Sequence, residues 1–340
     1  MNRRFLTSLS LLATLCVCLS LVAVPAKAQS SGADAWTAPR TADGHPDLQG
    51  VWANNNATPL ERPDEWTGKD RLTDEELADL MQAAADVVAS GEDAQFGDQL
   101  VLKALARIRD AGSYDTTGNY NQFWMADRDF THQTSLVIDP PDGRIPTLTS
   151  AATARVEARE AYERDHPADG PEDRALGERC ANFGVPRIGA GYNSYFQIFQ
   201  SREHVVVMKE MAHDSKVIAM DGTPHVADGV RLWNGDSRGQ WEGDTLVVES
   251  TNFSPKSRFR ESAEDLRLVE RYTRVGPDTL NYEVTITDAS TWTSPWTVRI
   301  PLRRSPDAVF EYACHEGNYG MEGILSGHRS DEATPQTDLQ

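Results

Sequence analysis

The sequence lacks several motifs that identify common enzyme classes. A phosphate-binding loop, the Gly-x-Gly-x-x-Gly dinucleotide fingerprint and the His-Glu-x-x-His zinc motif do not occur among its 340 residues. Their absence argues against nucleotide-dependent chemistry and against a zincin-type metalloprotease. Acid–base chemistry stays open, because it needs only positioned His, Asp, Glu or Tyr side chains.

Positive charge is also scarce. The chain holds 33 lysines and arginines against 52 aspartates and glutamates, which gives a formal net charge of −19 at pH 7. Such a chain repels phosphate backbones and anionic lipid, so the sequence predicts neither a nucleic-acid nor a membrane partner. The expected partner is a small-molecule substrate or ligand. The oligomeric state stays open.

Only one long apolar run occurs, and it lies at the N-terminus. Arg3 and Arg4 precede the apolar residues 5–24, and Ala26-Lys27-Ala28 places small residues around a cleavage point. This order is typical of a signal peptide, so we expect residues 1–28 to be removed and the protein to be periplasmic or secreted. The alternative is an uncleaved membrane anchor, because the run is long enough to span a bilayer.

Cysteine is rare, and only Cys180 and Cys314 lie outside the N-terminal segment. An even pair in an exported protein predicts one disulfide bond. It would close a loop of about 135 residues, worth roughly 4–5 kcal/mol by the loop-entropy argument. The alternative is a nucleophilic Cys314 beside His315, but neighbouring residues on a strand point to opposite faces.

The first part of the mature chain is predicted to be mainly loop and helix. Residues 29–64 are expected to be extended, with a first strand at Leu48-Gln49-Gly50-Val51-Trp52. Residues 65–170 are expected to form a helical insertion. It contains a capping box at Thr73-Asp74-Glu75-Glu76 and apolar residues at helical spacing, and a charged helix over residues 150–164. Whether this insertion is a lid or a separate unit stays open.

From residue 194 onward the hydrophobic pattern changes to period two. Turn signals such as Asp221-Gly222 and Asn234-Gly235 separate the alternating segments. Eight or more short strands at this spacing predict a mainly β (α+β) fold. We expect an antiparallel, lipocalin-like β-barrel or sandwich over residues 171–326, with an N-terminal helical insertion. Residues 327–340 are expected to be a disordered tail. The expected strands cover residues 195–199, 204–208, 215–220, 230–233, 245–251, 267–274, 279–287, 295–302 and 308–313.

The segment 311–320, EYACHEGNYG, concentrates reactive and hydrogen-bonding groups. His315 is a candidate general base, and Glu316 would orient it or share its proton. Asn318 or Tyr319 would polarise a substrate oxygen. The sequence therefore predicts part of a catalytic site in this segment.

A second candidate base is His213, at the end of a predicted strand. Asp214 or Glu210 would tune its proton affinity. The competing interpretation is a surface turn in which Asp214 supports the bend. For the first candidate base, unchanged turnover of the true substrate after His315→Ala would exclude the role of His315.

A metal centre is the weaker alternative. His213, His225 and His315, together with Glu316, have side chains that suit zinc or a similar ion, but none of their local spacings is a known ligand spacing. We therefore predict no metal and no other cofactor, and a structural or exposed role for His225. Residues 234–244 half resemble a calcium loop, yet Arg238 stands where an oxygen ligand is required, so a tight double turn is predicted instead.

Tryptophans form a further candidate site. Trp292 and Trp296 flank the end of a predicted strand, and with Trp52, Trp124 and Trp233 they would line an aromatic cavity for an apolar or sugar-like ligand. Packing in the barrel core is the alternative. The two interpretations are compatible, because a wide barrel has a lined interior.

Four strings resemble a large, uncharacterised family of exported bacterial proteins. They are TADGHPDLQGVW (41–52), WNGDSRG (233–239), WEGDTL (241–246) and EYACHEGNYG (311–320). The resemblance covers nearly the whole mature chain and implies an exported protein, periplasmic in a Gram-negative host. It implies no activity and no catalytic residues. Gly50-Val51-Trp52 is also similar to the first strand of lipocalin-like barrels, an analogy that concerns fold alone.

The expected function is therefore a small-molecule enzyme of the lyase, isomerase or hydrolase type, using cofactor-free acid–base chemistry in a barrel cavity. One alternative is a periplasmic binding protein for a hydrophobic or glycosidic ligand. Another is a structural envelope protein. Histidines that share a cavity would favour the enzyme, and a cavity of tryptophans alone would favour binding.

Overall fold

The computed structural model describes residues 36–90, 95, 97–108 and 125–333. The chain divides into a unit of residues 1–37, of which 36 and 37 are described, and a unit of residues 38–340, which holds every described helix and strand. The predicted signal peptide and Trp124 therefore lie outside the described residues. Within the described part of the chain, no helix is long and apolar enough to cross a membrane.

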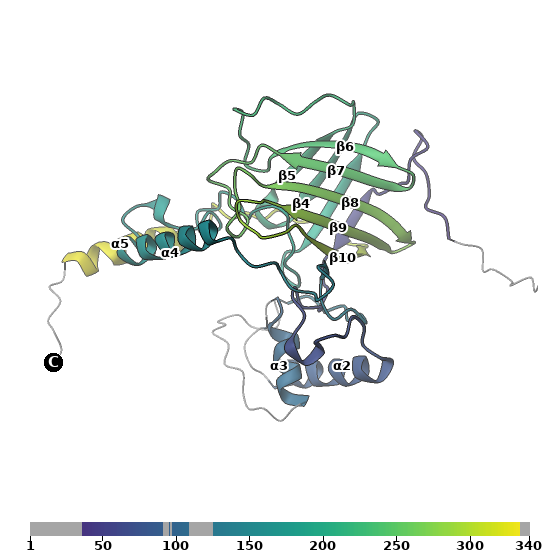
Figure 1. Cartoon of the computed structure of the whole chain (residues 1–340), viewed down its shortest axis with the longest axis horizontal. Helices are drawn as coiled ribbons and strands as arrows, with labels where there is room; N and C mark the ends of the chain where they lie inside the picture. Colours follow the sequence, from purple (N-terminus) through teal and green to yellow (C-terminus); the bar gives the residue numbers. More distant parts are fainter. Residues whose placement is uncertain (1–35, 91–94, 96, 109–124, 334–340) are drawn as a thin grey trace, which may run out of the picture. The chain divides into compact units, whose positions relative to one another are not determined.

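In the described part of the chain, ten strands form one sheet, and nine of them close into a barrel (Figure 1). The order is β1-β3-β4-β5-β6-β7-β8-β9-β10, β10 pairs again with β1, and β2 pairs with another part of β10. The barrel predicted from the sequence is confirmed. The strands are β1 (Gly50–Ala53), β2 (Val137–Asp139), β3 (Tyr195–Gln200), β4 (His204–Lys209), β5 (Ser215–Ala219), β6 (Asp236–Glu242), β7 (Thr245–Thr251), β8 (Arg267–Gly276), β9 (Thr279–Thr287) and β10 (Trp296–Ser305).

Period-two alternation explains the barrel walls. Along β9, Leu280, Tyr282, Val284 and Ile286 are buried, and the residues between them are partly exposed. Because successive side chains on a strand point to opposite faces, this pattern places one row in the barrel core. Each fully buried aliphatic side chain stabilises the fold by about 1.5–3 kcal/mol relative to an exposed one.

The short strand β1 closes the barrel, and its tryptophan fills part of the interior. Trp52 is fully buried, and its indole N–H donates to the carbonyl of Leu48 at 2.9 Å. The guanidinium carbons of Arg274 and Arg304 lie 5.6 and 5.7 Å from its ring centroid. Gly50 has a φ of 125°, which favours glycine at the start of this strand. The first strand predicted from the sequence is thus present.

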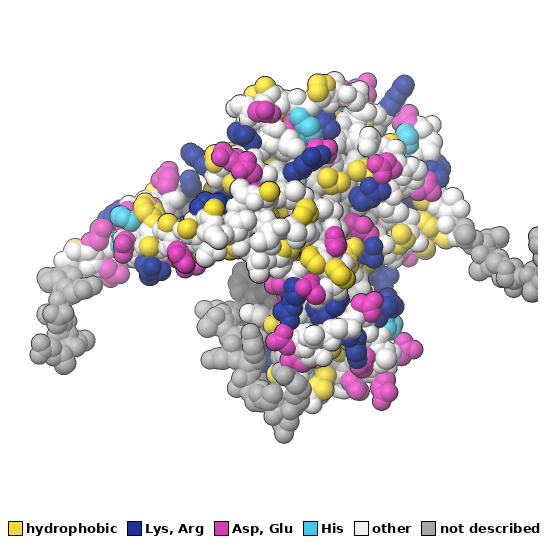
Figure 2. Space-filling view, viewed as in Figure 1, with side chains coloured by type: hydrophobic (Ala, Val, Ile, Leu, Met, Phe, Trp, Pro, Cys, Tyr) yellow, Lys and Arg dark blue, Asp and Glu magenta, His cyan; other side chains and the backbone are white. Residues whose placement is uncertain are grey.

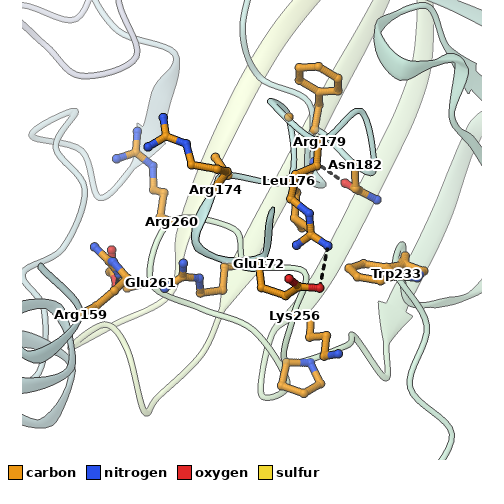
Figure 3. Close-up of a pocket in the computed structure, with 16 residues that line it drawn as sticks. Arg159, Glu172, Arg174, Leu176, Arg179, Asn182, Trp233, Lys256, Arg260 and Glu261 are labelled. Atoms are coloured by element: carbon orange, nitrogen blue, oxygen red, sulfur yellow. Dashed lines mark hydrogen bonds and ion pairs between the residues drawn. The ribbon is translucent and has the colours of Figure 1, made fainter. Parts of the chain in front are cut away.

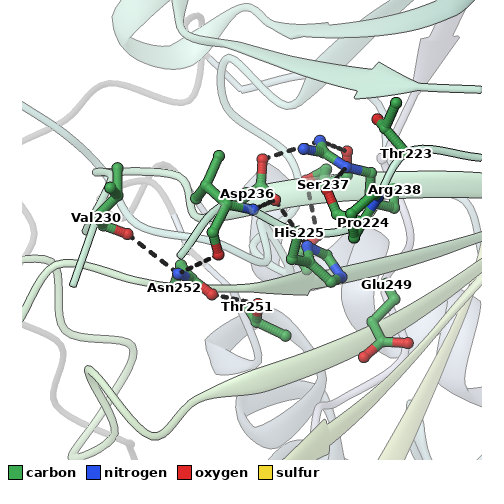
Figure 4. A network of polar contacts seen from close by, with 12 residues as sticks. Thr223, Pro224, His225, Val230, Asp236, Ser237, Arg238, Glu249, Thr251 and Asn252 are labelled. Carbon is green, nitrogen blue, oxygen red and sulfur yellow. Dashed lines mark hydrogen bonds and ion pairs between the residues drawn. The ribbon is translucent and has the colours of Figure 1, made fainter. Parts of the chain in front are cut away.

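Strands β5 and β6 are parallel, which a simple meander does not allow. Parallel neighbours need a crossover, and the long connection between these strands provides it. The Asn252 amide group stabilises this connection by donating to the carbonyls of Val226, Ala227 and Val230 (Figure 4). The expected strand at 230–233 is therefore wrong. The carbonyl of Val230 bonds to the Asn252 side chain, and in this segment only Leu232 forms a β-bridge, which is an isolated one.

The predicted double turn at residues 234–244 is also wrong. Residues 236–242 form β6, which pairs with β7 along its whole length. Only Gly243 and Asp244 remain as a turn between the two strands. Long-range pairing with β7 therefore overrides the local turn preference of the glycines and aspartates in this segment.

The helices agree with the sequence prediction except at the C-terminus. Thr73 and Glu76 form the expected capping box. The expected strand at 308–313 is absent, and residues 327–333, predicted to be disordered, belong to a helix that begins at Tyr319. Three glycines in that helix lower its intrinsic propensity, which hides it from local analysis. The helices are η1 (Asp64–Trp66), α2 (Asp74–Ala89), α3 (Gln99–Ile108), α4 (Ser150–Asp165), η3 (Pro171–Asp173), η4 (Met211–His213) and α5 (Tyr319–Ala333).

Candidate functional site

A network of charged and hydroxyl side chains lies among the inward-facing residues of the barrel. One carboxylate oxygen of Glu270 accepts hydrogen bonds from the phenols of Tyr272 and Tyr282, at 3.1 and 2.9 Å. The other oxygen contacts the ammonium of Lys216 and the hydroxyl of Ser250. The Glu270 and Lys216 side chains are only 3% and 6% exposed. A buried ion pair needs such additional hydrogen bonds to offset the loss of hydration.

Burial shifts the proton equilibria of this network. It raises the pKa of Tyr272 and of Tyr282 well above the ordinary value, and the neighbouring Glu270 carboxylate adds to both shifts. Burial also lowers the pKa of Lys209, against the opposing effect of Asp214. The tyrosines therefore remain protonated donors, and Lys209 releases its proton more readily than an exposed lysine does.

Asp214 joins these buried groups to the surface. One of its oxygens lies 3.2 Å from the Lys209 ammonium, and the other accepts from the Asn234 amide at 2.6 Å. The Asn182 amide lies 3.5 Å from Asp214, and Lys209 also donates to the carbonyl of Gly184 at 3.4 Å. Asn182 and Gly184 line a surface cavity. The Lys209–Asp214 pair thus lies directly behind the wall of that cavity.

This cavity, which we call the arginine cavity, has a volume of about 780 Å³ (Figure 3). Its lining comes mainly from residues 172–184 and 255–261, together with Trp233. The disulfide bond between Cys180 and Cys314 anchors the first of these segments and confirms the pairing predicted from the sequence. A volume of several hundred Å³ suits a small organic ligand.

Of the described residues, six cationic side chains line the arginine cavity, against two acidic ones. This balance is unusual for a chain with a net charge of −19, whose acidic and basic side chains are intermixed on the face drawn in Figure 2. Lys256, Arg258 and Arg260 form no ion pair with any described residue, whereas Arg159 pairs with Glu261. The six are Arg159, Arg174, Arg179, Lys256, Arg258 and Arg260.

A smaller cleft of about 480 Å³, the side cleft, shares Arg258 and Arg260 with the arginine cavity. It is also lined by Arg128 and Arg187. The buried Nε atom of each, and Nη1 of Arg128, find no acceptor among the described residues. Burial lowers the pKa of both guanidinium groups and raises the pKa of Asp98 in the same cleft. Buried N–H groups without an acceptor favour an anion beside them.

The histidines proposed from the sequence lie outside both cavities. His213 is exposed in η4, and its neighbour Asp214 turns to Lys209 instead. Nδ1 of His225 lies 2.7 Å from a carboxylate oxygen of Asp236, an interaction that stabilises the crossover connection (Figure 4). The structure therefore does not bring His213, His225 and His315 into one cavity, and the base role of His213 stays a prediction.

The segment 311–320 carries a tether and exposed polar groups. Its Cys314 forms the disulfide bond, and the Asn318 amide donates to the carbonyl of Glu178 at 2.8 Å. His315 and Glu316 are exposed, and Tyr319 is 78% exposed. None of these side chains lines the arginine cavity. The catalytic roles of His315, Glu316, Asn318 and Tyr319 stay predictions. Cys314 and Asn318 are the residues of this segment that join it to residues 178–180.

The tryptophans do not gather around one ligand site. Trp292 and Trp296 are buried in the barrel core with ring centroids 5.6 Å apart, and Trp52 lies in the same core. Trp233 is 46% exposed and lines the arginine cavity. Core packing, the alternative raised from the sequence, accounts for the three buried residues. Only Trp233 among the described tryptophans is placed to contact a ligand in that cavity.

The buried charged residues Lys209, Lys216 and Glu270 were not among the site residues predicted from the sequence. Their signal was present, because each occupies an inward-facing position of an alternating strand, where a charged residue requires a partner. Residues 235–239 match the Gly-x-Ser-x-Gly motif of hydrolases, which was not predicted either. In the hydrolase motif the serine stands on a strand-to-helix turn, whereas Ser237 lies within β6 and its hydroxyl is 2.8 Å from that of Ser250.

The described features define a β-barrel protein with a buried ion-pair network and a cation-rich surface cavity. Protein-family models, curated proteins and solved structures were compared with this chain, and none of them matched.

Proposed function

We propose that the arginine cavity binds a small organic anion, such as a carboxylate. The observation that carries this proposal is the set of three cations, Lys256, Arg258 and Arg260, that have no ion-pair partner among the described residues. Arginine recognises carboxylates through paired N–H donors, which makes this residue type suitable for the task. Trp233 supplies a flat apolar surface for the rest of the ligand.

The side cleft supports the same ligand class. Arg128 and Arg187 present buried N–H groups there that find no acceptor in the described part of the chain, and Arg258 and Arg260 belong to both cavities. An anion in this region would satisfy groups that otherwise remain desolvated and unpaired. The ligand class differs from the hydrophobic or glycosidic one predicted from the tryptophans, because three of those residues lie in the core.

The binding proposal is tested by titration calorimetry with succinate, citrate and benzoate as probes. A triple variant, Lys256→Gln, Arg258→Gln and Arg260→Gln, is expected to lower the affinity of the best probe at least tenfold, since each charge-assisted hydrogen bond contributes about 1.5–3 kcal/mol. The matched control replaces Arg202, Arg267 and Arg303, which are also exposed, with glutamine. It removes the same charge and should bind normally. Equal affinity in both triple variants would refute the proposal.

Acid–base catalysis on the bound anion is the second candidate function. It is favoured by the Lys209–Asp214 pair behind Asn182, because burial lowers the pKa of Lys209 and the Asp214 side chain is 21% exposed. Because neither side chain lines the cavity, the proton would pass through one bound water between Asp214 and a carbon next to the ligand carboxylate. This retains the lyase or isomerase class expected from the sequence, with Asp214 but without His315.

The catalytic proposal is tested by incubating the bound probe in D₂O and following its C–H signals by NMR. With the wild-type protein, the probe should take up deuterium at carbon or be converted to a product. The Asp214→Asn variant should lose that activity while it still binds the probe. Binding without any exchange in the wild-type protein would leave a binding protein and exclude this chemistry for the probe. Exchange that persists unchanged in Asp214→Asn would exclude Asp214.

We further propose export to an oxidising compartment, as the resemblance to exported bacterial proteins implies. The Cys180–Cys314 disulfide bond supports it, because such bonds persist mainly outside the cytoplasm. N-terminal sequencing of protein from the periplasmic fraction should begin at Gln29. A chain recovered in the cytoplasm with residues 1–28 intact would contradict both the cleavage and the location.

A further inference from the structure

We propose a zinc-binding site formed by Asp169, His328 and Glu332. One donor atom from each of these three side chains lies within 4.8 Å of the other two. The loop before η3 provides Asp169, and α5 provides the other two residues. None of the three lines the arginine cavity or the side cleft.

Helical spacing places two of the ligands together. His328 and Glu332 are four residues apart on α5, so their side chains lie on the same face of the helix. Nε2 of His328 lies 3.5 Å from Oε1 of Glu332 and 3.0 Å from Oδ1 of Asp169. Ligands at 2.0–2.1 Å in a tetrahedral zinc site are separated by about 3.3 Å. The two distances from His328 are therefore already close to those of a zinc site, and the two carboxylate oxygens lie within 4.8 Å of each other.

The groups around these ligands leave the required atoms available. The second oxygen of Asp169 lies 2.6 Å from Nδ1 of His166, which orients the carboxylate. Arg329 donates to the carbonyl of Asp169 and to Oε2 of Glu332, at 2.9 Å for the latter, and so leaves Oε1 facing His328. Hydrogen bonds of this kind to ligand carboxylates are typical of metal sites.

The donor set favours zinc over calcium or magnesium. Calcium and magnesium prefer six or more oxygen ligands, whereas zinc binds imidazole nitrogen as well as carboxylate oxygen and accepts three protein ligands with water in the fourth position. The two carboxylates balance the charge of the ion. A three-residue site also leaves a coordination position for water. The competing explanation is a surface ion-pair network, in which Arg329 and His328 simply pair with the carboxylates.

Stable anchoring of α5 makes the site possible. The Cys180–Cys314 disulfide bond and the hydrogen bond from Asn318 to the carbonyl of Glu178 join the start of α5 to the segment after Asp169. No residue of α5 is buried, so packing alone does not stabilise its far end. Zinc would hold the last turns of the helix against the loop.

The test is calorimetric titration of EDTA-treated, tag-free protein with ZnCl₂. We expect one site per chain, with affinity at least tenfold lower in His328→Ala and in Asp169→Asn. His204→Ala, which removes an exposed histidine on β4, is the matched control and should bind as the wild type does. Because the three ligands are exposed or half-buried, these variants should retain the fold, which far-UV circular dichroism checks.

A second measurement follows the amide hydrogens of α5 by hydrogen exchange. Zinc should slow exchange in the last turns of the helix in wild-type protein and not in His328→Ala. Absence of zinc binding in the wild type would overturn the proposal. Equal affinity in His328→Ala and His204→Ala would also overturn it, because the ion would then be held at scattered surface groups.

Discussion

Replacing Glu270 with glutamine should destabilise the barrel by about 3–5 kcal/mol, the usual cost of removing one partner of a buried ion pair. Glutamine keeps the side-chain volume and an acceptor for Tyr272 and Tyr282, so the change isolates the charge. What remains is the ammonium of Lys216, which is only 6% exposed and would lose its carboxylate partner. For a domain with a typical stability of about 5–15 kcal/mol, that loss is large.

A double-mutant cycle separates this effect from simple repacking. Lys216→Met alone should be similarly destabilising, because it leaves the Glu270 carboxylate buried without its cation. Combining Lys216→Met with Glu270→Gln removes both charges, and the double variant should be more stable than either single variant. The coupling energy then measures the interaction of the two charges.

Urea unfolding, followed by tryptophan fluorescence with the disulfide bond intact, provides the assay. Glu283→Gln is the control, because Glu283 pairs with Arg299 at 2.7 Å on the partly exposed outer face, where such a pair contributes at most about 1 kcal/mol. If Glu270→Gln cost no more than Glu283→Gln, the charges inside the barrel would not be desolvated as described. That result would also show that Lys216 and Glu270 do not depend on each other for their stability inside the barrel.

Three further predictions concern stability. The pKa of Tyr272 and of Tyr282 is higher in the folded than in the unfolded chain, so their contribution to the free energy of unfolding is complete below about pH 10 and is lost as the pH rises further. Replacing both tyrosines with phenylalanine should therefore flatten the fall in stability to urea between about pH 9 and 11. An unchanged slope would contradict this prediction. Replacing Cys180 and Cys314 with alanine should lower the free energy of unfolding by about 4–5 kcal/mol; a loss below about 1 kcal/mol, measured by the same unfolding curves, would show that the closed loop contributes little. Thr73→Ala removes the side-chain acceptor of the α2 capping box and should cost about 1 kcal/mol, with Thr67→Ala outside the box as a control that should cost less.

Local patterns were sufficient for the elements that local forces control. The capping box at Thr73 and Glu76 placed the start of α2, and alternating residues placed strands such as β9. Patterns failed where distant segments decide the conformation. Residues 236–242 have turn-forming composition, yet pairing with β7 makes them a strand. Helix α5 forms although three glycines lower its own propensity, and its His328 contacts the distant Asp169.

The sequence by itself determined the mainly β class, with a barrel or a sandwich as its two forms, the pairing of Cys180 with Cys314 and the scarcity of positive charge. Alternation, cysteine count and composition are properties of the chain that do not depend on how the strands are ordered. Only the tertiary structure decided which charged residues meet. Lys216 and Glu270 are 54 positions apart and become partners because both face the barrel interior. Lys256 and Arg179 line one cavity for a similar reason, since the fold brings their loops together.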